Sequence, residues 1–322
     1  MSQWRGMNGL LEGVYAGEIR AIARMMSLAE GAQRPVHDAM GEIYRRAGRA
    51  HVVGLTGSPG SGKSTLVGAL TRAVRKSGRK VGIVAVDPSS PFSGGAILGD
   101  RIRMTDLATD KGVFVRSLAT RGNLGGLASA SLDTVDILDA AGFDLVLIET
   151  VGVGQDEVDI ARAAHTVVVV SAPGLGDEVQ AIKAGVLEIA DIHVVSKADR
   201  PDANKTASDL HAMLGLGLSR RDQGSWSVPV ICTSAETGEG VRGLGSAIDS
   251  HGMHLSNSGE RDRRQHEIAE MRVLKIAENM VRGRVEQERE ASLRTMFDDL
   301  TSRRLDPHSA ARKLLQDLNL VF

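Results

Sequence analysis

Cysteine is almost absent from this sequence, which has one cysteine, Cys232, among 322 residues. A single thiol excludes an internal disulfide and any cysteine-rich metal site. Cys232 ends the apolar run 228–232, and this setting predicts a small core side chain. So little cysteine favours a reducing compartment, and we expect a cytoplasmic protein.

The sequence also lacks a strong charge of one sign and a long apolar run. Its 39 basic and 40 acidic residues give a formal net charge of −1, so neither nucleic acid nor a membrane is expected as a partner. No stretch is long enough to span a bilayer. Glu12, Glu18 and Glu30 interrupt the first part of the chain, which argues against a secretory or transit peptide. With 42% hydrophobic residues, we expect a globular protein.

Short β-branched runs alternate with helical stretches from residue 50 onward. This alternation predicts a mainly parallel sheet with helices on both faces, which is a doubly wound α/β fold. The expected strands are residues 51–56, 80–86, 112–116, 143–149, 165–171, 191–196 and 228–232.

Helical segments flank this α/β region. Apolar residues at helical spacing predict two helices before residue 50, around 19–26 and 36–47. A polar break is expected at 252–259, followed by a helix around 273–280 and an all-helical tail. The expected division is an N-terminal helical extension over 1–48, an α/β domain over 49–250 and a C-terminal helical arm over 251–322.

The segment after the first expected strand matches the P-loop pattern, and a helix with Leu66, Leu70 and Val74 follows it. Its glycines let successive backbone N–H groups point at phosphate oxygens. Lys63 would reach the β and γ phosphates, and the Ser64 hydroxyl would coordinate Mg²⁺. The loop predicts a nucleoside triphosphate site and leaves ATPase, GTPase and small-molecule kinase open. It reads Gly57, Ser58, Pro59, Gly60, Ser61, Gly62, Lys63, Ser64.

Carboxylates follow other expected strands. Glu149 ends the strand 143–149, where a P-loop protein places an acid near Mg²⁺, and Gly152 could sense the γ-phosphate through its N–H. Asp87 and Asp100 lie in turns from which they could reach Mg²⁺ or its water shell, although turns of this composition often have no ligand.

The segment from Ser196 to Asp199 favours guanine as the base. It resembles the Asn-Lys-x-Asp guanine motif with serine in place of asparagine. The Asp199 carboxylate can accept two hydrogen bonds from guanine, and the Lys197 stem can cover the base. Ser234 and Ala235 resemble the second guanine loop, in which a backbone N–H meets the base oxygen.

Together these motifs closely resemble the MeaB/ArgK/MMAA family of GTPases, over most of residues 18 to 245. The resemblance implies hydrolysis of GTP to GDP by a metallochaperone that gates adenosylcobalamin loading and protects an acyl-CoA mutase, such as a methylmalonyl-CoA or isobutyryl-CoA mutase. The segments that carry it are 57–65, 86–91, 94–104, 149–155 and 176–178 with Gln180 and Lys183.

The resemblance also implies residue roles. Lys63, Ser64 and Thr65 would hold phosphate and Mg²⁺, with Asp87, Asp100 and Glu149 around the metal and the attacking water. Ser196, Lys197 and Asp199 would hold guanine. Residues 87–104 would form a first switch, and 149–157, which contain Gln155, a second. Asp177, Glu178 and Lys183 would lie in a third switch that the mutase reads, through its cobalamin-binding domain.

The resemblance further implies that the C-terminal helices form a homodimer and that cobalamin is reached only through the mutase.

Three alternative functions remain open on the residues alone. A P-loop kinase of a small metabolite would share the loop but have no use for Asp199. A nickel or zinc chaperone normally has cysteine or histidine clusters, which are not evident here. A nucleotide-bound scaffold would hydrolyse GTP only incidentally.

Overall fold

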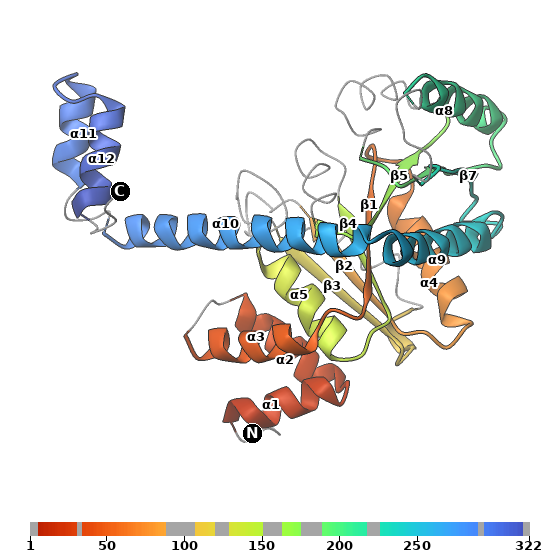
Figure 1. The fold of residues 1–322 in the computed structure, drawn as a ribbon, viewed down its shortest axis with the longest axis horizontal. Helices are drawn as coiled ribbons and strands as arrows, with labels where there is room; N and C mark the ends of the chain where they lie inside the picture. The colour runs from red at the N-terminus through yellow and green to blue at the C-terminus, as the bar shows by residue number, and fades with distance from the viewer. Residues whose placement is uncertain are drawn as a thin grey trace. The chain divides into compact units, whose positions relative to one another are not determined.

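The computed structural model describes residues 6–30, 34–87, 107–119, 129–150, 163–174, 189–217, 226–288 and 293–317. These contain a seven-stranded sheet in the order β3-β2-β4-β1-β5-β6-β7, in which neighbouring strands are parallel (Figure 1). Each expected strand is present, which confirms the α/β class. The strands are β1 (His51–Thr56), β2 (Val81–Asp87), β3 (Val113–Ala119), β4 (Leu145–Thr150), β5 (Thr166–Ser171), β6 (Ile192–Val195) and β7 (Val230–Cys232).

Helices cover both faces of the sheet (Figure 1). On one face, alternate strand residues such as Leu55 and Leu147 are buried in one cluster with Leu70 of α4 (Lys63–Arg75) and Leu244 of α9 (Val241–Ser258). On the other face, α5 (Ser129–Ala140) packs on β2 and β4. This burial on both faces explains the continuous apolar strands in the sequence. At the β7 edge, α8 (Ala203–Gly217) packs on β6 and β7.

Within residues 6–30 and 34–50, three helices precede β1, one more than expected: α1 (Gly6–Tyr15), α2 (Ile19–Ala29) and α3 (Arg34–Arg46). They pack on one another and on α5. The sequence did not predict α1 because its glycines disfavour helix, whereas burial of Leu10, Leu11 and Val14 stabilises it. Asp139 of α5 fixes the connection to β1, since its carboxylate accepts backbone N–H groups of Gly48 at 2.8 Å and Ala50 at 3.1 Å.

The expected polar break at 252–259 is confined to Gly259, which has a φ of 76° and ends α9; the expectation is wrong for 252–258, which continue the helix. A Cβ on Gly252 would lie 2.9 Å from His51 Cε1, so this glycine permits close packing of the helix rather than ending it. Cys232 is half-buried at the end of β7, so it is a less buried side chain than expected.

The tail is helical as expected, with α10 (Glu260–Glu288), α11 (Leu293–Thr301) and α12 (Pro307–Asp317). The chain divides into two compact units, Met1–Ile268 and Ala269–Phe322, and the boundary falls within α10. In the second unit, Met296 of α11 and Ala310 of α12 share a small apolar core. None of the helices that the structure describes is long and apolar enough to cross a membrane.

Candidate nucleotide site

The P-loop connects β1 to α4 at the carboxyl edge of the sheet. Gly57, Gly60 and Gly62 have φ values of 136°, 77° and 90°, a region that side chains with a Cβ rarely adopt. A Cβ on Gly57 would also lie 2.0 Å from the carbonyl oxygen of Val170 in β5. Glycine is therefore required at Gly57 by its conformation and by the close approach of β5.

Lys63 is the first residue of α4 and is 6% exposed. Its Nζ donates hydrogen bonds to the carbonyl oxygens of Gly57 at 2.7 Å and Ser58 at 3.0 Å. The loop therefore holds the ammonium group against its own backbone. Phosphate oxygens are stronger, anionic acceptors, and at this position they would compete with those carbonyls for the ammonium.

Ser64 and Glu149 meet beside the P-loop. The Ser64 Oγ donates to Glu149 Oε1 at 2.5 Å, and the Glu149 side chain is buried near the end of β4, next to Leu55 of β1. A hydroxyl and a carboxylate are hard oxygen ligands of the kind that Mg²⁺ prefers, so these residues fit that ion. Asp87 ends β2 at the same edge of the sheet, where Val86 pairs with Thr150.

A cavity of about 220 Å³ lies where the base of a nucleotide on this loop would be expected. The residues after β6 and β7 line it, as the sequence predicts for a guanine pocket, together with the start of α4. Its lining includes Gly62, Thr65, Ser196, Lys197, Asp199, Arg200, Thr233, Ser234, Ala235 and Glu236.

Ser196 and Lys197 connect the loop after β6, residues 196–199 (the base loop), to the P-loop. The buried Ser196 Oγ lies 2.5 Å from the Ser61 carbonyl oxygen and 3.0 Å from that of Ser171. Lys197 adopts a φ of 53°, and its Nζ donates to the Gly60 carbonyl oxygen at 2.8 Å. The serine hydroxyl at the asparagine position of the guanine motif thus contacts P-loop backbone.

Asp199 is prepared to accept hydrogen bonds. A hydrogen bond from the Ser234 hydroxyl lowers the pKa of the exposed Asp199 carboxyl, so the group is ionised at neutral pH. The Ser234 N–H is used by the Glu239 carbonyl at 3.0 Å. Gly240 closes this loop with a φ of 69°, and a Cβ there would lie 1.9 Å from the Cys232 carbonyl oxygen.

The structure therefore brings together four separate segments of the chain: the P-loop, Glu149, and the two loops at 196–199 and 233–236. Ser171 was not singled out from the sequence, yet its carbonyl accepts the Ser196 N–H at 2.8 Å and holds the base loop. The only signal in the sequence for this role of Ser171 is its place at the end of an apolar strand. The Asp87 side chain lies outside the described residues, as do Asp100, Gly152, Gln155, Asp177, Glu178 and Lys183.

This fold and this site define a P-loop GTPase. Residues 22–290 match the family described as methylmalonyl Co-A mutase-associated GTPase MeaB, and the chain belongs to that family. The membership confirms both the resemblance seen in the sequence and GTP hydrolysis as the activity.

Individual relatives support the same family assignment. A Pyrococcus horikoshii protein provisionally named a GTPase is 46% identical over 316 residues, which cover 96% of this chain and 97% of the relative. GTPase ArgK of Escherichia coli is 36% identical over 249 residues, covering 76% of this chain and 75% of ArgK. A solved structure described as an LAO/AO transport system kinase has a TM-score of 0.70 at 25% identity, with 97% of each chain covered.

Proposed function

We propose that this GTPase is a G-protein chaperone of an adenosylcobalamin-dependent acyl-CoA mutase, gating cofactor loading and protecting the mutase from inactivation. The observation that supports this role best is the match of residues 22–290 to a family described as mutase-associated. A mouse relative, 37% identical over 221 residues that cover 67% of this chain and 53% of the relative, is named a methylmalonic aciduria type A homolog, mitochondrial. We place the present chain in the cytoplasm.

Lys63 and the P-loop amides would bind and orient the phosphates. Ser64 and Glu149 would hold Mg²⁺, with Asp87 and Asp100 near its water shell, and the ion would neutralise charge on the β and γ phosphates. Glu149 would also help to position the attacking water, and the Gly152 N–H would contact the γ-phosphate. Phosphoryl transfer requires positioning and charge stabilisation rather than covalent catalysis, which is what these groups can provide.

Guanine would lie in the 220 Å³ cavity. The ionised Asp199 carboxylate would accept the ring N–H and the exocyclic amine of guanine, and the Lys197 stem would cover the base. Because the Ser234 N–H is already bonded to Glu239, we assign the base oxygen to the Ala235 N–H. Ser196 would position the base loop against the P-loop.

Coupling to the mutase would run through the switches. Residues 87–104 and 149–157, with Gln155, would respond to the γ-phosphate, and Asp177, Glu178 and Lys183 would transmit the nucleotide state to the mutase. A partner accelerates hydrolysis only if it favours the aligned arrangement of metal, Glu149 and water. We therefore expect slow intrinsic turnover and faster turnover in the complex.

The helical arm over 251–322 would form a homodimer. Apolar side chains on α10 support this, since Val273, Leu274 and Met280 are 66%, 59% and 70% exposed. Large exposed apolar residues repeated along one helix are typical of an interface. The extension over 1–48 and the GTPase domain over 49–250 would complete each protomer.

Two measurements test the function at the level of chemistry. First, GTP and ATP turnover are compared, with the product identified as free phosphate or as a phosphorylated metabolite. A preference for GTP with release of free phosphate supports the GTPase, and transfer to a metabolite would instead support a kinase. Second, the tagged protein is mixed with purified methylmalonyl-CoA and isobutyryl-CoA mutases, and failure to bind either in any nucleotide state would contradict the chaperone role.

A further inference from the structure

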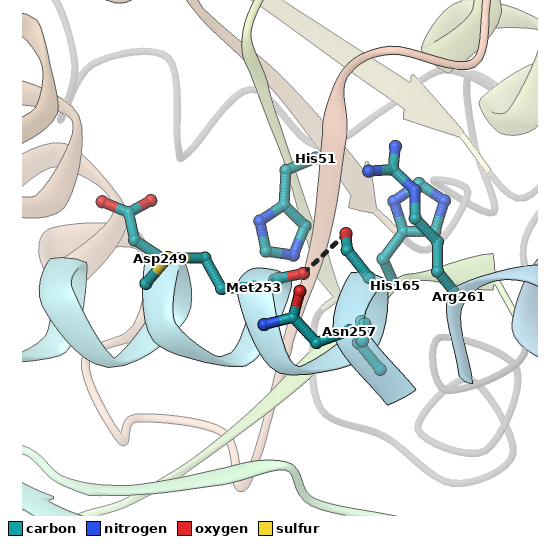
Figure 2. Close-up of a pocket in the computed structure, with 9 residues that line it drawn as sticks. His51, His165, Asp249, Met253, Asn257 and Arg261 are labelled. Atoms are coloured by element: carbon teal, nitrogen blue, oxygen red, sulfur yellow. Dashed lines mark hydrogen bonds between the residues drawn. The ribbon is translucent and has the colours of Figure 1, made fainter. Parts of the chain in front are cut away.

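A second pocket, of about 440 Å³, lies at the opposite edge of the sheet from the P-loop. His51 begins β1, and His165 directly precedes β5, so both lie at the amino ends of strands whose carboxyl ends face the nucleotide site. Residues of α9 and α10 form the rest of its wall. Figure 2 shows His51 facing α9, with Arg261 beside His165 at one end and Asp249 at the other.

Two hydrogen bonds and one charge contact set the protons on His51. The Thr166 hydroxyl lies 2.7 Å from both His51 Nε2 and His251 Nδ1, and it has a single proton to donate. His251 Nε2 lies 3.4 Å from the Asp191 carboxylate and makes no hydrogen bond to it, but the nearby negative charge favours the N–H on Nε2 and an acceptor at Nδ1. Thr166 then donates to His251 and accepts from His51 Nε2. His51 Nδ1 is therefore an acceptor.

His165 contributes a donor to the same pocket. The side chain is more than nine-tenths buried, and its Nδ1 accepts the Val52 N–H at 3.1 Å. The ring proton must then be on Nε2, for which the described part of the chain provides no partner. Burial lowers the pKa of His165 to about 3 and that of His51 to about 4, so both rings are neutral near pH 7.

Arg261 provides a positive charge. Its only hydrogen bond among the described residues is a long one, 3.3 Å, to the Gly48 carbonyl oxygen, and no described carboxylate pairs with it. The guanidinium group has five N–H donors in a planar fork that suits a carboxylate. Asp249, at the other end, already has a cationic partner, Arg79 at 2.8 Å, and would repel a second negative charge.

We propose that this pocket binds a small monoanionic organic acid that carries a hydroxyl group. The carboxylate would accept from Arg261 and His165 Nε2, the hydroxyl would donate to His51 Nδ1, and the carbon chain would lie against Met253. The cationic Arg261 disfavours a metal ion, and no group of three potential metal ligands occurs within the described residues. A pocket of this size is ample for such a ligand.

The test uses ¹⁵N-labelled full-length protein and lactate, 3-hydroxybutyrate, acetate and inorganic phosphate as probes. In the free protein, His51 should be protonated on Nε2 only and His165 on Nε2 only. A hydroxy acid should shift the His51 Nδ1 and His165 Nε2 signals, acetate should affect mainly His165, and phosphate should bind more weakly. Affinity should change little between about pH 6 and about pH 8, because the rings stay neutral there.

Arg261→Gln should weaken binding roughly tenfold or more through loss of a charged hydrogen-bond partner. His165→Asn keeps an acceptor for Val52 and should weaken binding as well. Arg263→Gln, a neighbouring exposed arginine that does not line the pocket, should have no effect. GTP turnover should be unchanged in all three variants, which separates this site from the nucleotide site. No shift with either hydroxy acid, equal binding of phosphate, or undiminished binding in Arg261→Gln would overturn the proposal.

Discussion

Acidification from about pH 7 to about pH 5 should destabilise the folded chain through His51, His165 and His251. Burial is the main cause that lowers the pKa of each: to about 4 for His51, about 3 for His165 and about 4 for His251. In the unfolded chain each has a pKa near 6.5. Below that value the unfolded state binds protons that the folded state excludes, so the free energy of unfolding falls with pH.

The size of the effect follows from the pKa differences. At about pH 5, each histidine should cost about 2 kcal/mol, and the three together up to about 6 kcal/mol, which is comparable to the whole stability of many domains. The loss begins near the unfolded pKa and levels off as the pH passes the folded pKa. Above about pH 7 these histidines should contribute no pH dependence.

Urea unfolding of wild type and His165→Asn at a series of pH values measures this loss of stability. The asparagine retains an acceptor for the Val52 N–H, and the variant should lose about 1 kcal/mol less per pH unit between about pH 6 and about pH 4. His211→Asn, at an exposed position of α8, is the matched control and should follow wild type. Parallel curves for wild type and His165→Asn would refute the assignment of His165 as a buried neutral ring.

Further predictions concern the nucleotide site. Lys63→Ala should nearly abolish GDP and GTP-analogue binding in calorimetry, because it removes the charged contact to the phosphates, and wild-type affinity would contradict the P-loop role. Asp199→Asn should weaken guanine binding and shift preference toward xanthine nucleotides, because an acceptor is replaced by a donor that faces a donor, so an unchanged GTP to ATP affinity ratio would remove it as the base reader. Gly57→Ala, which places a Cβ 2.0 Å from the Val170 carbonyl oxygen, should eliminate nucleotide binding, whereas Gly215→Ala in α8, with open space around it and no positive φ, should not.

The strands and the P-loop could be predicted because each depends on local sequence. β-branched runs buried on both faces have an unmistakable pattern, and the loop needs glycines followed by Lys63 and Ser64. The helix α1 and the continuation of α9 through Gly252 could not be predicted, because packing on α5 and on His51 overrides poor local helix propensity.

The same distinction applies to the sites. The types of residue that line the proposed base pocket could be read from the sequence, but the contact of Ser196 with Ser61, 135 positions away along the chain, depends on the order of strands in the sheet. The pocket at the amino edge was not predicted at all. Its histidines and Arg261 lie on segments far apart in sequence that form no motif, and only the parallel arrangement of β1 and β5 brings them together.

In the proposed function, a mutase controls GTP hydrolysis by this chain. The most direct test is GTP turnover measured alone and with a candidate adenosylcobalamin mutase, in wild type, Asp177→Ala and Lys183→Ala. We expect clear stimulation of wild type, with little stimulation but near-normal GTP binding in both variants. Switch ordering and arginine fingers contribute roughly 10³ to 10⁵ in rate elsewhere, so even partial loss should be measurable. Equal stimulation of all three proteins would contradict the third-switch role, and no stimulation by any such mutase would contradict the chaperone function itself.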